Sequence, residues 1–408
     1  MNLHSHAVSC QDTTAALQAL HAQLDGVSQP QLVFAFHGAG HEDQRVFASL
    51  RTRFPEAALI GGTSSGGLLT DTGVHDAHSI GVLCLHDPDG DYGVAAAELG
   101  SDAAATAQQL LIDALASCGC AGELPELVWI YQAPGREEQV LEGLRRVVGD
   151  RCPIIGGSSA DDDVSGAWRQ LGPQGSLTDG LVVAVLFPSR PVRYAFQGGY
   201  EPVGPSGVVT QIGYHADGHQ GVVTARRGRE ILEIDGEPAA QVYNRWSQGR
   251  IAAQLGVGGS VLLDTTLLPL ATVVGQADGV SHYLLAHPDA VTAEGGLRTF
   301  CDLGVGDRVY AMRGDRERLI ERAGRVALQA RRALPQRGDG SRVAGALLVY
   351  CGGCKLAVGE QIDRVKESVA TSIDGAPFIG CFTFGEQGRL LDRNRHGNLM
   401  ISAVVFGD

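Results

Sequence analysis

Three similar glycine-rich segments occur along the chain, and this internal repeat constrains the fold more than any other feature. They read AALIGGTSSGG (57–67), CPIIGGSSADD (152–162) and APFIGCFTFGEQG (376–388). In each, an apolar run that ends in Ile-Gly leads into small or polar residues, as in a strand that ends in a tight turn. Repetition within one chain indicates that the same folding unit is built three times.

Apolar runs flank each of these turns. The runs before the turns are LVFAF (32–36), LVWIY (127–131) and ALLVY (346–350), and those after them are IGVLCL (80–85), LVVAVLF (181–187) and LMISAVVF (399–406). Between a leading run and its turn the apolar residues take helical spacing, as at Val46, Phe47, Leu50 and Phe54. Each repeat is therefore predicted to fold as a strand, a loop, a helix, a second strand, a turn and a third strand.

These units predict an α/β protein of two lobes, in which repeated strand-helix-strand-strand units form mixed sheets flanked by helices. At 408 residues the chain exceeds one average domain. We expect a helical segment over residues 1–29, a first domain over 30–200 and a second over 201–408. The boundary is placed at the glycine- and proline-rich stretch GGYEPVGPSGVV (198–209).

Charge and composition exclude several classes of protein. The formal net charge is −14, and Lys355 and Lys366 are the only lysines. A chain without a basic face is not expected to bind nucleic acid. No apolar run approaches the roughly 18 residues that cross a bilayer, and the N-terminal residues lack a secretory pattern, so we expect a cytoplasmic protein without membrane insertion. Nine scattered cysteines do not suit a secreted disulfide framework.

Several motifs together resemble a FIST-domain protein, with both the N-terminal and the C-terminal FIST segments. They are IGGTSSGG, PIIGGSSADD, EIDGEPAAQVYNRW (233–246) and the terminal CGGCKLAVGEQIDRVKESVATSIDGAPFIGCFTFGEQG (351–388). The resemblance covers nearly the whole chain after residue 30. It implies a bacterial sensory module that binds a small ligand and signals to a partner, with amino acids as one proposed ligand class. Some free-standing members resemble nitric-oxide-sensing haem proteins that regulate histidine kinases, which makes haem a candidate cofactor and a histidine kinase a candidate partner.

The ends of the repeated strands are the candidate ligand site, because strand-end loops of α/β units converge at one edge. Glycines there let backbone N–H groups approach a ligand, and hydroxyls can hydrogen-bond a carboxylate or phosphate. The alternative is that these are tight turns whose hydroxyls bond their own backbone. The candidate residues are Gly61, Gly62, Thr63, Ser64, Ser65, Gly156, Gly157, Ser158, Ser159, Cys351, Cys354, Cys381, Phe384 and Glu386.

Glu386 is the strongest single candidate. It lies in an apolar and glycine-rich segment near Phe382 and Phe384. A carboxylate there needs a partner or becomes neutral, so a ligand ammonium or an arginine is expected beside it. The FIST resemblance places a Tyr/Phe-Gly-Glu motif on residues 384–386. The alternative is a structural Glu that caps an element or pairs with Arg389.

Thiols and imidazoles give further hypotheses. Cys351 and Cys354 form a CxxC which, with Cys381, is interpreted as a redox pair, a metal site or plain loop thiols, and a thiol-dependent enzyme using the first two is a second alternative function. His37, His41, His215 and His219 are weak candidates for a metal or haem ligand, since both pairs lie in glycine-bearing loops. GTSSG (62–66) fits the GxSxG spacing, but an apolar run rather than a helical pattern follows it. No Walker or post-strand GxGxxG motif occurs, so we expect no enzymatic activity.

Overall fold

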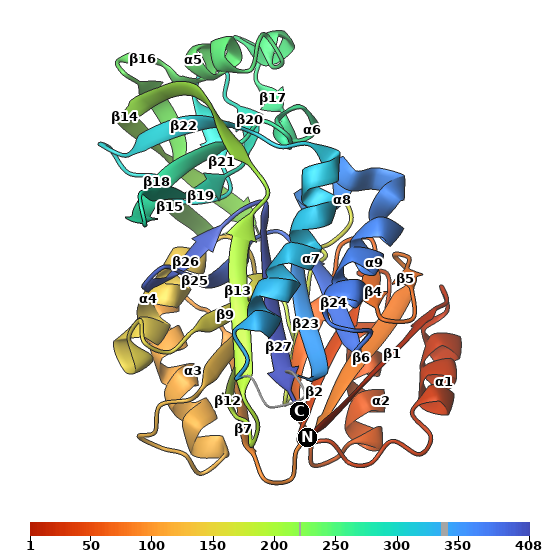
Figure 1. The fold of residues 1–408 in the computed structure, drawn as a ribbon. Helices are drawn as coiled ribbons and strands as arrows, with labels where there is room; N and C mark the ends of the chain where they lie inside the picture. The colour runs from red at the N-terminus through yellow and green to blue at the C-terminus, as the bar shows by residue number, and fades with distance from the viewer. Residues whose placement is uncertain (220–221, 336–341) are drawn as a thin grey trace.

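Three copies of one folding unit build the lower lobe of the molecule (Figure 1). The computed structural model describes residues 1–219, 222–335 and 342–408, except for the side chains of residues 211–228. Each copy contains an edge strand, a helix, a leading strand, a second helical segment, a second strand, a hairpin and a closing strand. The sequence-based unit is confirmed, and each copy additionally begins with an edge strand and a helix.

The elements of the three copies follow in chain order. The first copy is β1 (Asn2–Ser9), α1 (Thr13–Gln23), β2 (Leu32–His37), α2 (Asp43–Arg53), β3 (Ala58–Thr63), β4 (Leu68–Thr70), β5 (Val74–His75) and β6 (Ser79–His86). The second is β7 (Asp91–Glu98), α3 (Ala103–Ser117), β8 (Leu127–Gln132), α4 (Glu137–Val148), β9 (Ile154–Ser158), β10 (Gln170–Gly172), β11 (Gly175–Leu177) and β12 (Gly180–Phe187). The third is β13 (Val192–Gly198), α7 (Arg316–Arg332), β23 (Val343–Cys351), α8 (Gly352–Val358), a 3-10 turn (Gly359–Gln361), α9 (Ile362–Ser372), β24 (Phe378–Thr383), β25 (Glu386–Leu390), β26 (Arg393–Gly397) and β27 (Met400–Gly407).

Each copy contributes to a six-stranded sheet, and each sheet takes its last two strands from another copy. The orders are β1-β6-β2-β3-β10-β11, β7-β12-β8-β9-β25-β26 and β13-β27-β23-β24-β4-β5. Within each sheet the leading and second strands are parallel and the other pairs are antiparallel. Because the hairpins are exchanged, each copy depends on another copy to complete its sheet. The exchange brings the three glycine turns to the same end of the lobe.

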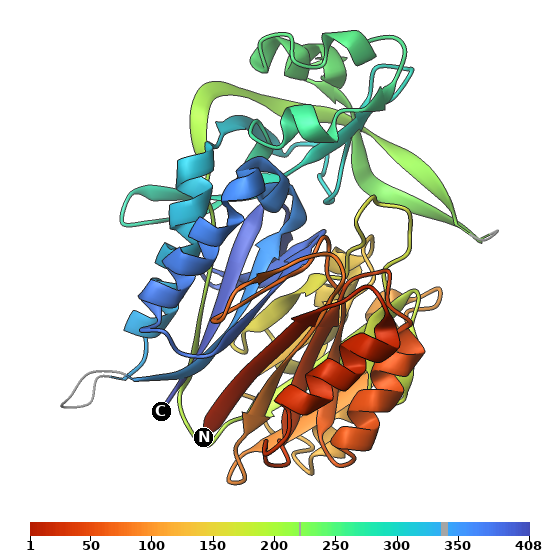
Figure 2. The ribbon, with the colours of Figure 1, turned by 90° about the vertical axis from the view of Figure 1, so that its right-hand side faces the viewer.

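Buried apolar side chains from all three sheets meet in one central cluster. Phe34 and Phe36 of the first copy, Trp129 and Tyr131 of the second and Leu347 of the third belong to it. Helix pairs α1–α2, α3–α4 and α7–α9 pack against the opposite faces of the three sheets, and Figure 2 shows the first and third pairs on separate sides. The predicted α/β class, with two lobes and mixed sheets flanked by helices, is confirmed.

The upper lobe is an insertion in the third copy, between β13 and α7 (Figure 1). It contains β14 (Glu201–His219), β15 (Val222–Ile234), β16 (Glu237–Pro238), α5 (Ala239–Trp246), a 3-10 turn (Ala252–Gln254), β17 (Gly259–Ser260), α6 (Leu262–Thr265), β18 (Leu270–Ala277), β19 (Val280–Ala286), β20 (Pro288–Val291), β21 (Leu297–Thr299) and β22 (Arg308–Arg313). These strands form one sheet with its own apolar core. The expected boundary at residue 200 falls where the chain enters this lobe, and the rest of the third copy then returns to the lower lobe.

Candidate functional site

The three glycine turns touch one another. Ser65 N donates to Phe382 O over 3.1 Å, and Ser64 Oγ accepts from Phe382 N over 2.8 Å, which joins the first and third copies. Ser158 N donates to Gly385 O over 2.8 Å, and Ala160 N donates to Thr63 O over 3.2 Å. The structure therefore brings all three turns together at one end of the lower lobe.

The hydroxyls of these turns already have protein partners. Ser64 Oγ donates to Gly67 O over 2.6 Å, Ser159 Oγ to Gln132 O over 3.1 Å, and Ser158 Oγ to Glu137 Oε1 over 2.8 Å. Thr63 Oγ1 bonds the backbone at residue 169, whereas Ser65 is only half-buried. Ser64 therefore bonds within its own turn, as the alternative expects, whereas Thr63, Ser158 and Ser159 bond other segments of the chain. Ligand binding by these groups stays a prediction.

The glycines of the turns allow backbones to pack closely. A Cβ atom on Gly61 would lie 1.7 Å from Ala35 O, and one on Gly156 would lie 1.9 Å from Ile130 O. Gly62 and Gly157 are equally crowded by atoms of the neighbouring strands. Close approach of neighbouring strands therefore accounts for the repeated glycines, as it does for glycine in strand interiors generally.

Glu386 is fully buried and hydrogen-bonded. Its Oε1 accepts from Thr383 Oγ1 over 2.7 Å, and its Oε2 accepts from Met400 N over 3.0 Å. Burial raises the pKa of Glu386 well above its usual range, and the adjacent Cys351 thiol adds to this. Burial therefore favours the neutral form of this carboxyl, which needs no counter-charge.

The expected arginine partner of Glu386 lies elsewhere. Arg389 donates to Tyr194 Oη over 3.1 Å, so the proposed pair with Glu386 is wrong. The repeat explains why a neutral group suits this position. Glu386 pairs with Gly157 across the sheet, and Gln170 holds the same place opposite Gly62 in the first sheet.

The thiols of the candidate site are enclosed. Cys351, Cys354 and Cys381 are all buried and unbridged. Burial raises the pKa of Cys351 well above its ordinary value and that of Cys381 likewise. Because the thiolate is the reactive form, a raised pKa favours the unreactive protonated thiol at Cys351 and Cys381. Phe384, by contrast, is half-buried and packs edge-on against Trp168, with ring centroids 6.1 Å apart.

Two of the four expected imidazole ligands, His37 and His41, are enclosed. His37 ends β2 fully buried, with Nδ1 3.0 Å from Gly38 O, and burial lowers its pKa to about 4. His41 is 6 % exposed and contacts Thr13 Oγ1 over 3.1 Å. An axial imidazole must open onto a slot that admits the macrocycle, whereas both rings are enclosed. His215 and His219 lie on β14, where side chains are outside the described residues.

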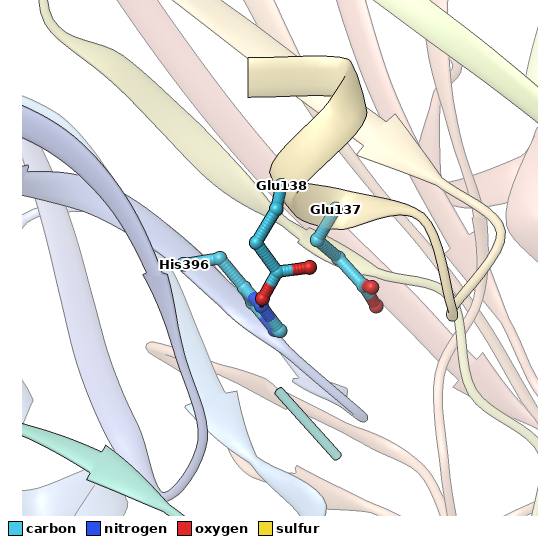
Figure 3. Close-up of side chains that lie close together, drawn as sticks. All are labelled: Glu137, Glu138 and His396. Carbon is cyan, nitrogen blue, oxygen red and sulfur yellow. The ribbon is translucent and has the colours of Figure 1, made fainter. Parts of the chain in front are cut away.

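A buried ionic cluster joins the two lobes, and sequence reasoning missed it. Arg229 on β15 of the upper lobe bonds Glu137 Oε2 over 2.7 Å and Glu138 Oε2 over 2.8 Å, both in the first turn of α4. Its Nε bonds Asp302 Oδ1 over 2.9 Å. His396 on β26 bonds Glu138 Oε1 through Nδ1 over 2.8 Å (Figure 3). We call these five residues the junction cluster.

Charged residues of the junction cluster stabilise the ionised forms of their neighbours. The Arg229 side chain is 5 % exposed and that of Glu137 is 2 %. Burial opposes ionisation of Glu138, but Arg229 and His396 outweigh it and hold its pKa far below the usual range. Burial would likewise lower the pKa of His396, but Glu138 and Glu137 raise it. Burial and Glu138 raise the pKa of Asp302 to about 6.

The same residues have the donor set of a cation site. One ligand atom each from Glu137, Glu138 and His396 lie within 4.8 Å of one another. Two carboxylates and an imidazole suit a divalent metal. The Arg229 guanidinium, however, already bonds both carboxylates, so a protein cation takes the place that a metal would need.

A signal for half of this cluster was present in the sequence. QAPGREE (132–138) follows the second leading strand, just as HGAGH follows the first and CGGC the third. On sequence alone, Glu137 and Glu138 indicate only charges that favour a helix N-terminus. Nothing near Arg229 in the sequence indicates its partners, because Glu137 and Glu138 lie in the other lobe and Asp302 is 73 residues away.

A cavity of about 200 Å³ lies in the upper lobe. Trp246, Ser247, Gln248 and Arg250 line one side of it, and segments 267–268 and 313–314 line the other. None of the predicted site residues whose side chains the structure describes lines this cavity. The described part of the chain also contains no helix long and apolar enough to cross a membrane.

Comparison with known proteins gives two family matches. A model described as the FIST N domain matches residues 31–237, and one described as the FIST C domain matches residues 239–389. No curated protein matches the sequence. Among solved structures, cyanuric acid hydrolase from A. caulinodans has a TM-score of 0.36 at 9% identity, covering 99% of this chain and 98% of its own. PurLQS from Thermotoga maritima has 0.22 at 9%, covering 84% and 74%. Both similarities are too weak to carry an argument.

Proposed function

Because the chain belongs to the FIST family, whose domains are sensory modules of signal transduction that bind small ligands, we propose that it is a cytoplasmic sensor that reports ligand binding to a partner protein. The observation that carries this proposal is the junction cluster. A sensor needs an element with two arrangements that a ligand can bias. The lobes share apolar contacts, since Ala271, Leu285 and Met312 of the upper lobe lie in the same buried cluster as Leu319 of the lower lobe. The junction cluster adds buried charges to this contact, and these charges are the part that a ligand can bias.

The cluster favours a two-state arrangement for electrostatic reasons. With Arg229 in place, the Glu137 and Glu138 carboxylates are paired and the lobes are closed. If the lobes separate, all of these charged groups become hydrated again. The open state therefore avoids the free-energy cost of a buried charge that has lost its partner. A ligand that binds one arrangement more tightly than the other would shift the equilibrium between them. The difference between the two binding free energies sets the size of the shift.

We propose no enzymatic step for this chain. The thiols at residues 351, 354 and 381 are buried, and the raised pKa of Cys351 and Cys381 argues against a thiol-dependent enzyme. Nine unbridged cysteines, seven of them buried, support a reducing compartment and hence the cytoplasmic assignment.

A haem-based nitric-oxide sensor that regulates a histidine kinase is the alternative. The enclosed rings of His37 and His41 weigh against it. An absorption scan of protein purified from haem-supplied cells separates the two proposals. A stoichiometric Soret band that survives gel filtration would replace the leading proposal with the haem one, and its absence would remove the alternative.

Hydrogen exchange tests the sensor proposal. Metabolites are first screened for those that raise the unfolding temperature of the full chain, since a ligand at about 100 times its Kd adds about 2.7 kcal/mol. Exchange is then measured with and without each such compound at peptides 135–140 and 394–398, which carry the lower-lobe half of the junction cluster. We expect altered exchange there. Compounds that bind and leave both peptides unchanged would contradict sensing through the lobes.

A further inference from the structure

The upper-lobe cavity lies at the connection between the lobes. Arg313, one of its lining residues, ends β22 and pairs across the sheet with Glu201, the first residue of β14. The next lining residue, Gly314, packs so closely on Tyr200 that a Cβ there would meet the ring at 2.4 Å. The chain leaves the lower lobe just before Glu201 and re-enters it at Asp315, the N-cap of α7. One wall of the cavity is thus formed by the segment that returns the chain to the lower lobe, and the outgoing segment packs against that wall.

The floor of the cavity is held from several sides. Leu268 O accepts from Tyr243 Oη over 2.6 Å, and Leu267 O accepts from Gly314 N over 2.9 Å. The adjacent Thr266 O accepts from Tyr200 Oη over 2.9 Å. These bonds tie the floor to α5 and to both linking segments, so the cavity is a formed site rather than a gap between loops.

Two arginines give the cavity its charge. Arg250 and Arg313 are both exposed at its rim, and neither makes an ion pair with any residue whose side chain the structure describes. Other arginines of this lobe differ, since Arg245 pairs with Glu237 over 2.9 Å. In a chain of net charge −14, two uncompensated guanidinium groups at one hollow favour an anion.

Apart from the two arginines, the lining combines the polar side chains of Ser247 and Gln248 with apolar ones. Trp246 is half-buried at the end of α5, and Leu267 and Leu268 are half-buried opposite it. A volume of about 200 Å³ lies below the roughly 300–1,000 Å³ of drug-sized pockets, so the occupant is a small molecule. Such a lining suits a flat or aliphatic body attached to the anionic group.

We propose that this cavity is a binding site for a small organic anion, with its carboxylate or phosphate between Arg250 and Arg313 and its apolar body against Trp246. The inference rests on the proposed sensory function, for which it supplies the ligand site. Binding joins the end of α5 to the linking segment before α7. A ligand there acts directly on the connection through which the lobes move.

The test uses benzoate, phenyl phosphate and neutral benzamide as probes. Binding is measured by calorimetry on the full chain and by the fluorescence of Trp246 in a full-length variant with Trp129 and Trp168 replaced by Phe. We expect saturable binding of at least one anion, about tenfold or more tighter than benzamide. The two anions distinguish a carboxylate from a phosphate site. Arg250→Gln and Arg313→Gln should each weaken the anion about tenfold or more, because each removes a charge-assisted bond.

Arg308→Gln is the matched control, because Arg308 is exposed on the same strand as Arg313 and does not line the cavity. Equal weakening by the control, equal binding of benzamide, or no saturable binding of either anion would overturn the proposed site. The two proposals fail separately. If the anion binds but hydrogen exchange at the junction cluster does not change, the proposed sensory function is contradicted and the proposed anion site stands. If a screened compound alters this exchange even in both arginine variants, the anion site is contradicted and the sensory function stands.

Discussion

Replacing Arg229 with methionine should be one of the most damaging single changes to the contact between the lobes. Arg229 bonds three carboxylates at 2.7, 2.8 and 2.9 Å, and its own side chain is 5 % exposed. Methionine fills a similar volume without charge. The variant therefore isolates the electrostatic contribution from the packing contribution.

The magnitude follows from what the variant leaves behind. Glu137 is 2 % exposed, and without Arg229 it faces Glu138 with no arginine between them. Breaking a buried ion pair by removing one partner costs roughly 3–5 kcal/mol. The exposed pair of Arg245 with Glu237, at 53 % and 56 % side-chain exposure, provides the control. Arg245→Met should cost at most about 1 kcal/mol.

Urea unfolding followed by far-UV circular dichroism and tryptophan fluorescence measures both variants. In variants that keep one of the three tryptophans, with the other two replaced by Phe, Trp129 reports the central cluster of the lower lobe and Trp246 reports the upper lobe. We expect Arg229→Met to lower the transition midpoint of both probes and to separate them. A cost for Arg229→Met as small as that for Arg245→Met, with coincident transitions, would refute the electrostatic account of the junction.

Three further predictions concern the interior. Glu386→Gln should change the unfolding free energy by less than about 1 kcal/mol. It should also remove the loss of stability that Glu386 causes as pH rises above about 4.3, because the folded carboxyl holds its proton more tightly than the unfolded one. An unchanged pH profile in urea titrations would contradict this. His396→Asn should make the unfolding free energy depend less on pH above about pH 6.5. The raised pKa of His396 gives a stabilisation that is complete below that pH and is lost as pH rises through the pKa of the folded state. A pH dependence that stays equally steep in the variant would assign the effect to another group. Gly61→Ala should lower the unfolding free energy by about 1–3 kcal/mol or more, because its Cβ would meet Ala35 O. Gly40→Ala is the control, since its Cβ would have open space around it, and should change the unfolding free energy by no more than about 0.5 kcal/mol. Equal shifts of the unfolding temperature in the two variants would disprove the close-packing role of Gly61.

The repeat in the sequence was enough to predict the α/β class and the meeting of the glycine turns. Apolar strands such as 127–131 and turns such as 152–162 are local signals, and local periodicity determines which element forms. The exchange of hairpins among sheets could not be predicted in the same way. It depends on contacts such as Gly157 with Glu386, which are far apart in the chain and leave no local pattern.

The candidate site shows the same limit more strongly. Glu386 was singled out because a carboxyl in an apolar segment needs a partner, and the structure provides Thr383 and a backbone N–H instead of a charge. The junction cluster needs Arg229 and His396, which are separated by more than a hundred residues and lie in strands of ordinary composition. Only the position of Glu137 and Glu138 after a strand end could have drawn attention to it.

A distance measurement between the lobes tests the central claim most directly. Spin labels are placed at Val257 in the upper lobe and Ile112 on α3, which are 77% and 42% exposed, after the half-buried Cys10 and Cys118 are replaced by serine. Double electron–electron resonance then compares this protein with its Arg229→Met variant. The account predicts one narrow distance distribution in the parent and a broader or shifted one in the variant. Identical distributions would contradict the claim that the junction cluster holds the lobes in a single arrangement.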